Sequence, residues 1–101
     1  MENTRQAASH LRVQVTLLSN VAAARRGQFR TKLRVGMRNY ECEISPDEPL
    51  VPGGHAVHAA VAFDQPAEAL PHLPAGSTFE LWEGSRRGYG MVLAVGATAA
   101  R

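Results

Sequence analysis

The chain has 101 residues, of which 45% are hydrophobic and 20% are charged, and its formal net charge is +2. This composition is typical of an ordinary globular domain, and the length allows one domain with one modest core. It leaves no room for a nucleotide-hydrolysing domain beside a second folded unit. No stretch approaches the 18 apolar residues of a membrane span, and we expect no signal peptide at the N-terminus.

The small net charge hides a strong segregation of charge along the chain. Residues 1–40 carry eight basic residues and one acidic residue, which gives +7. Residues 41–83 carry eight acidic residues and no Lys or Arg, and residues 84–101 carry three arginines. Such asymmetry is typical of a basic face for nucleic acid, but it also arises when the two halves pair with each other. The register of the strands decides between these interpretations.

Alternation of apolar and polar residues predicts half-buried strands over residues 11–18, 29–35 and 40–44. The four residues 36–39 between the last two strands fit a hairpin loop.

In that hairpin we expect Val35 to lie opposite Tyr40. Arg34 then faces Glu41 and Lys32 faces Glu43, which leaves Arg30 as the one base of its row without an acidic partner. Opposite charges across a ladder stabilise a sheet, so an ion-paired outer face is favoured over a nucleic-acid stripe along this strand.

The second half of the chain contains shorter strands between loops rich in proline and glycine. Residues 45–54, with three prolines and two glycines, form a loop. In residues 55–63 the alanines favour a helix, but the alternation along this segment and the flanking glycines and proline favour a strand. We expect a strand here. Residues 65–76 are mostly loop, with one helical turn over 67–70. The last strands are expected over 78–83 and 89–95.

Six short strands in about 85 residues predict an all-β fold, a single closed six-stranded antiparallel barrel. Closure removes the exposed strand edges that promote aggregation. The barrel is expected to span residues 10–96, with flexible tails at 1–9 and 97–101.

Two stretches of the sequence are similar to the C-terminal β-barrel of elongation factor Tu and related translation GTPases. The first is Val51-Pro52-Gly53-Gly54-His55, which leads into an apolar strand, where the family has an aliphatic-Pro-Gly-Asp turn. The second runs from Phe79 to Val92, FELWEGSRRGYGMV, where the family shows Phe-x-Ile-Arg-Glu-Gly-Gly-Arg-Thr-Val-Gly-x-Gly-Val-Val. The resemblance covers roughly residues 10–96 and implies the fold expected above.

The resemblance also implies a function, because in this family the barrel helps to grip the T-stem of aminoacyl-tRNA and docks on neighbouring protein domains. The corresponding positions here are the loop 20–28 and the turn 84–87. The His-Thr pair that the family carries in its first loop is absent from this chain. No GxxxxGK[ST] phosphate loop occurs either, so we expect no GTP, no GTPase activity and no other cofactor.

Five arginines are the candidates for binding the phosphates of RNA or another polyanion, because the guanidinium fork contacts phosphate oxygens in pairs. These five arginines are Arg25, Arg26, Arg30, Arg86 and Arg87. The alternative is that they only make the surface soluble.

Trp82 is the candidate for anchoring a protein partner, because it falls on the outward face of its strand. The alternative is that a loop, for example 65–76, covers it. The partners expected are therefore a structured, tRNA-like RNA, a translation-associated protein or a second copy of the chain, with no role at a membrane.

Other reactive side chains indicate no catalytic or metal site. His55 and His58 point to opposite faces if their segment is a strand, so they cannot share a metal ion. Cys42 is expected to point inward as an inert core thiol. We therefore predict a non-enzymatic binding module, and the single cysteine is typical of a protein from the reducing cytoplasm.

Overall fold

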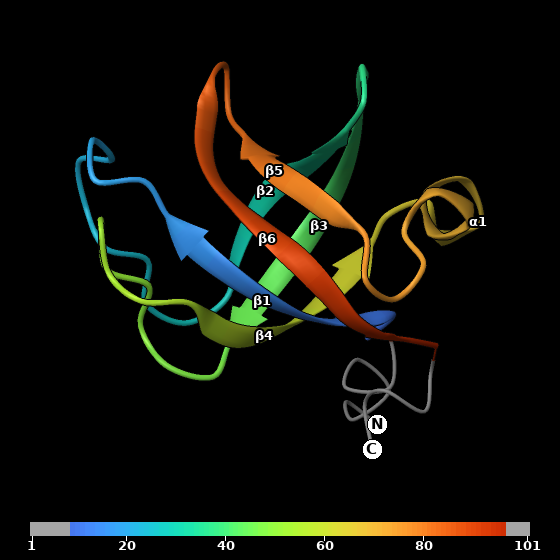
Figure 1. Ribbon diagram of the computed structural model, residues 1–101, viewed down its shortest axis with the longest axis horizontal. Coiled ribbons are helices and arrows are strands. Elements are labelled where there is room, and N and C mark those ends of the chain that lie inside the picture. Colours follow the sequence, from blue (N-terminus) through green and yellow to red (C-terminus); the bar gives the residue numbers. More distant parts are fainter. Residues whose placement is uncertain (1–8, 97–101) are drawn as a thin grey trace.

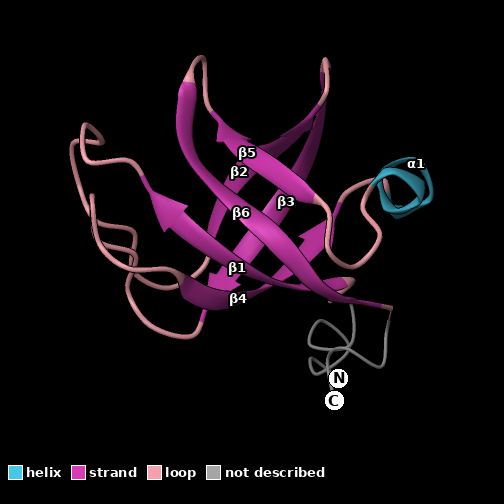
Figure 2. Cartoon of the chain, in the orientation of Figure 1, coloured by secondary structure: helices cyan, strands magenta, loops and turns pink. Residues whose placement is uncertain are grey.

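A computed structural model describes residues 9–96 of the chain (Figure 1). The tails expected at 1–9 and 97–101 lie, apart from Ser9, outside the described residues. Six strands and two short helical turns make up the described part (Figure 2). The strands are β1 (Leu11–Leu17), β2 (Phe29–Val35), β3 (Arg38–Pro46), β4 (Val57–Phe63), β5 (Thr78–Trp82) and β6 (Arg86–Val95), and the helical turns are α1 (Pro66–Ala69) and η2 (Leu70–His72).

The six strands form a closed barrel in the order β1-β4-β3-β2-β5-β6, and β6 returns to pair with β1. All neighbours are antiparallel. The predicted closed six-stranded antiparallel barrel is therefore confirmed. The ambiguous segment 55–63 is a strand over Val57–Phe63, as its alternation indicated. The described residues contain no helix with the length and apolar character needed to cross a bilayer.

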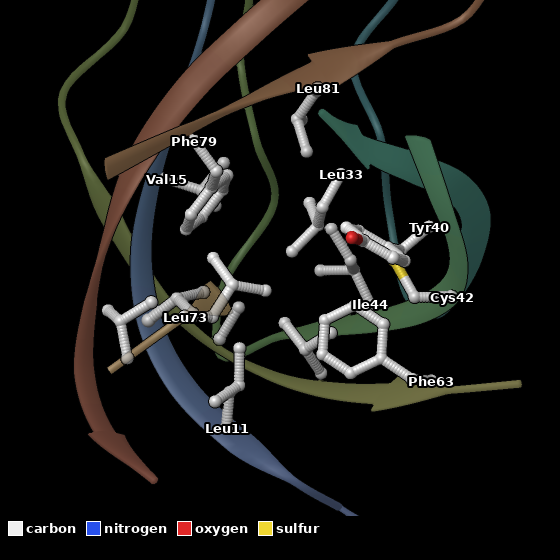
Figure 3. Close-up of a cluster of buried hydrophobic side chains, with 14 of the residues drawn as sticks. Leu11, Val15, Leu33, Tyr40, Cys42, Ile44, Phe63, Leu73, Phe79 and Leu81 are labelled. Carbon is white, nitrogen blue, oxygen red and sulfur yellow. The ribbon is translucent and has the colours of Figure 1, made fainter. Parts of the chain in front are cut away.

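The core consists of the inward half of each alternating strand. In β1, Leu11, Val13, Val15 and Leu17 are all buried, whereas the residues between them are half-buried. Figure 3 shows side chains from several strands pointing into one common interior. Cys42 lies fully inside, as predicted, and burial raises the pKa of its thiol to about 12, so that the thiol form persists at neutral pH.

The segment between β4 and β5 packs against the core of the barrel. Pro66 begins the predicted helical turn, where its missing N–H costs nothing, and the turn continues as η2. Ala69 and Leu73 from this segment are fully buried in the core. The ring of His72 stacks on Tyr40 with 6.0 Å between ring centroids.

The predicted pairing of β2 with β3 is wrong by two residues. Leu33, not Val35, lies opposite Tyr40, because the chain reverses over Gly36 and Met37 in a two-residue turn instead of a four-residue loop. Gly36 has a φ of 62°, which suits the tight hairpin turn. A shift of two residues keeps every side chain on its expected face but changes its partner. Arg34 consequently faces the neutral Asn39 instead of Glu41.

Gly88 and Gly90 allow β6 to approach β1 closely. A Cβ atom at Gly88 would overlap the carbonyl oxygen of Thr16, and one at Gly90 would overlap that of Gln14. The Gly-x-Gly pattern of the sequence is therefore a packing requirement at the β1–β6 contact.

Candidate nucleic-acid interface

Arg25 is held by the turn that joins β5 to β6. Its two terminal nitrogens donate to the two carboxylate oxygens of Glu83 at 3.1 and 2.7 Å. Its guanidinium also lies over the ring of Phe29, 5.0 Å from the centroid, and its backbone pairs with Leu50. The loop 20–28 thus meets the β5–β6 turn through Arg25 and Glu83, the residue directly before the expected turn 84–87.

The carboxylate of Glu83 is ionised more readily than a free glutamate. The hydrogen bonds from Arg25 lower the pKa of Glu83, and partial burial opposes this shift. The Thr31 hydroxyl lies near the carboxylate and lowers the pKa further, although it makes no hydrogen bond of normal geometry and is buried without another partner. The positive charge of Arg25 is therefore largely used inside the molecule.

Arg30 has carboxylate partners that the sequence analysis did not find. Its guanidinium lies 2.6 Å from Asp64 and 3.9 Å from Glu41, and Glu43 faces it across the ladder. The hydrogen bond to Asp64 raises the pKa of Arg30. The expectation that Arg30 is the one unpaired base of its row is wrong, because the ladder is shifted and Asp64 follows the end of β4.

The arginines of the last hairpin also have partners within the chain. Arg86 lies 3.5 Å from Glu80 on the adjoining strand. Arg87 donates to the backbone carbonyl of Glu83 at 3.3 and 3.4 Å. Arg26 is exposed and, within residues 9–96, has no carboxylate within 4.0 Å. Of the five candidate arginines, Arg26 is the one that has no hydrogen-bond or ion-pair partner in residues 9–96.

Trp82 is half-buried on the outer face of β5, and a cation covers it. The guanidinium of Arg34 lies over the indole ring, 4.1 Å from its centroid. Segment 65–76 packs elsewhere, against the core and Tyr40. Lys32 lies directly opposite Trp82 in the β2–β5 ladder. We call Lys32, Arg34 and Trp82 the basic–aromatic face.

The two cations of the basic–aromatic face make no close ion pair in the described residues. Within the described part of the chain, neither has a carboxylate within 4.0 Å, and the hydrogen bonds of Arg34 go to Asn39 and to the sulfur of Met37. The sequence analysis missed this face because its hairpin register placed Arg34 opposite Glu41 and Lys32 opposite Glu43. In the structure Lys32 faces Glu41 across the β2–β3 ladder and Arg34 faces Glu80 across the β2–β5 ladder, but neither pair comes within 4.0 Å. The signal that finds it is the two-residue turn at Gly36-Met37, which sets the register.

A hollow of about 300 Å³ lies beside Trp82. It forms because β5 pairs with β2 only at Lys32–Arg34, bulges between Leu81 and Trp82, and then turns away. Trp82 and Gly84 line one side of the hollow. The cations Arg30 and Lys32 and the carboxylates Glu41 and Glu83 also line it. Arg34 is not part of its wall.

The histidines form no metal centre in the described residues, where no three His, Cys, Asp or Glu side chains are arranged to hold an ion. His55 lies 3.6 Å from Glu48. His10 accepts a hydrogen bond from the backbone N–H of Phe63 at its Nδ1, at 2.9 Å, and burial lowers the pKa of its imidazole. These contacts are structural.

No protein family model matches the chain, and no curated protein matches its sequence. A six-stranded barrel does not by itself identify a relative of elongation factor Tu. The basic–aromatic face and the hollow beside it are therefore interpreted from their own chemistry.

Proposed function

We propose that this chain is a non-catalytic binding module for RNA, and that the basic–aromatic face is its contact surface. The observation that carries the proposal is that Lys32 and Arg34 flank Trp82 and, within residues 9–96, form no ion pair within 4.0 Å. Cations beside an accessible aromatic ring are the usual components of a surface that binds nucleic acid without reading its sequence. The resemblance to the elongation factor Tu barrel supports RNA as the polyanion and translation as its setting.

The loop arginines enter this proposal unequally. Arg26 is available to a phosphate without any rearrangement. Arg25, Arg30 and Arg86 would first have to exchange a carboxylate for a phosphate, and Arg87 a backbone carbonyl. The buried, protonated thiol of Cys42 is in keeping with a cytoplasmic protein.

A titration with tRNA at about 50 and about 200 mM salt tests the proposal. Three phosphate contacts would weaken binding about 20- to 40-fold between these concentrations. Arg34→Gln and Lys32→Gln should each weaken binding and reduce the salt dependence. Arg12→Gln is the matched control, because Arg12 is not among the candidate residues and its guanidinium already pairs with Asp47 at 2.8 Å. No binding at low salt, or binding that neither variant changes, would refute the RNA function.

An apolar stripe on β6 favours a second candidate, self-association of the barrel. Tyr89, Leu93 and Val95 are 50%, 37% and 39% exposed, and Met91 between them is half-buried. An apolar strand face is complementary to its own copy across a two-fold axis. Sedimentation should then show a dimer that Leu93→Arg dissociates, whereas Val51→Arg, at an exposed position in the loop before β4, should not. A monomer at high concentration would exclude the dimer.

A further inference from the structure

We infer that the hollow beside Trp82 receives a single unpaired base of the RNA, stacked against the indole ring. The inference rests on the proposed RNA function and specifies the form of RNA that the face prefers. The volume of about 300 Å³ is at the lower limit of small-molecule sites, which suits one base and not a whole nucleotide.

The charges around the hollow select a neutral ligand. Arg30 and Lys32 contribute two positive charges, and Glu41 and Glu83 contribute two negative ones. The two carboxylates disfavour a phosphate group within the hollow, and the two cations equally disfavour a Lys or Arg side chain from a protein partner. A flat, uncharged group that can stack on an aromatic ring fits this lining, and a nucleobase is such a group.

The polar groups also match the edge of a base. Glu41 is exposed, and its contact with Arg30 is long, at 3.9 Å, so its oxygens are open to accept hydrogen bonds from the exocyclic amino group of cytosine, adenine or guanine. Arg34 covers the ring of Trp82 but does not line the hollow, so it leaves the side of Trp82 that faces the hollow accessible. Lys32 faces Trp82 and lines the same hollow, so it can contact the phosphate next to the bound base.

Base pairing would block this arrangement, because a stacked and paired base cannot leave its helix without an unpairing cost. The face should therefore prefer single-stranded RNA or an unpaired loop over a continuous duplex. Glu41 should further favour oligocytidylate and oligoadenylate over oligouridylate, since uracil has no exocyclic amino group.

The fluorescence of Trp82, the only tryptophan of the chain, reports directly on the hollow. The intact protein is titrated with oligocytidylate, oligouridylate and an RNA duplex of equal charge, while binding is measured separately by anisotropy of labelled RNA. Oligocytidylate should quench Trp82 and bind more tightly than the duplex. Trp82→Leu should weaken single-strand binding about tenfold and duplex binding much less, and Trp82→Phe should retain most of the affinity. Glu41→Gln should reduce the preference for cytidylate, whereas Glu68→Gln, outside the hollow, should not.

Three results would overturn the inference and leave the RNA function standing: binding by anisotropy without quenching, equal affinity for single strand and duplex, or no effect of Trp82→Phe and Trp82→Leu alike. Absence of any RNA binding at low salt would overturn both. The quenching experiment uses the unmodified protein, so it decides the matter even if Trp82→Leu does not fold.

Discussion

Arg25 and Glu83 lie 58 positions apart in the sequence and meet through two parallel hydrogen bonds of 3.1 and 2.7 Å. Their side chains are only 25% and 29% exposed. The pair joins the loop after β1 to the turn between β5 and β6. Neither residue lies in a strand, so no strand ladder connects these two segments at this point.

We expect this pair to be worth more than the surface ion pairs. Truncating Arg25 or Glu83 to Ala should each cost about 2 kcal/mol, with a coupling energy of about 1–2 kcal/mol in a double-mutant cycle. The cycle is measured by urea unfolding. The Arg86–Glu80 pair, more exposed and 3.5 Å apart, serves as the control and should couple by less than about 0.5 kcal/mol. Equal coupling in both cycles would contradict a special role for Arg25.

The same pair predicts a loss of stability in acid. The pKa of Glu83 is lower in the folded chain than its ordinary value of 4.5, so the unfolded chain binds the proton first as the pH falls. The contribution of Glu83 is fully present above pH 4.5 and is lost as the pH falls through the folded pKa. Unfolding of Glu83→Gln should therefore depend less on pH below 4.5 than that of the wild type. A parallel pH dependence would contradict this assignment.

His10 should make stability fall in mildly acidic solution. Burial lowers its pKa below 6.5, and its Nδ1 must stay unprotonated to accept the hydrogen bond from Phe63. The unfolded chain takes up this proton first, so stability is complete above pH 6.5 and falls below it, by at most about 1.4 kcal/mol per pH unit. Urea unfolding between pH 5.5 and 8 should show this slope in wild type and in His58→Gln, an exposed control, but not in His10→Gln. Identical slopes in the two variants would refute the assignment.

Gly90→Ala should destabilise the barrel by about 2–3 kcal/mol. The added Cβ would overlap the carbonyl oxygen of Gln14 and press on the ring of Phe79, and the β1–β6 ladder has no free space to accept it. Gly27→Ala is the control, because its Cβ would meet no atom within 4 Å and its φ of 71° alone should cost about 1 kcal/mol. Equal losses of unfolding free energy would show that β6 does not need the close approach.

Thr31→Val should leave stability unchanged or raise it by about 1 kcal/mol. The Thr31 hydroxyl is buried without a hydrogen-bond partner, and valine has the same shape without the cost of burying a polar group. Thr16→Val, half-buried on the outer face of β1, controls for the substitution itself. A loss above about 1 kcal/mol, measured by unfolding, would show that the hydroxyl bonds to Glu83 in solution.

Alternation along the chain predicted the barrel and its core, because whether a side chain of a strand points inward depends only on the parity of its position. The inward orientation of the buried residues of β1 and of Cys42 followed from this two-residue alternation. The register of the β2–β3 hairpin did not follow, because a shift of two residues preserves the parity. The candidate site inherited that error, since the neighbours of Lys32 and Arg34 depend on the register.

The sequence by itself therefore determined the fold class, the inward and outward face of the strands, and the segregation of basic and acidic residues along the chain. These properties are local, because they depend on periodicity and turn composition. Only the tertiary structure decided which charges remain free. Arg25 and Arg30 find carboxylates from distant segments, whereas Arg34 finds the ring of Trp82. These contacts depend on which strands become neighbours when the barrel closes, and no local pattern in the sequence specifies them.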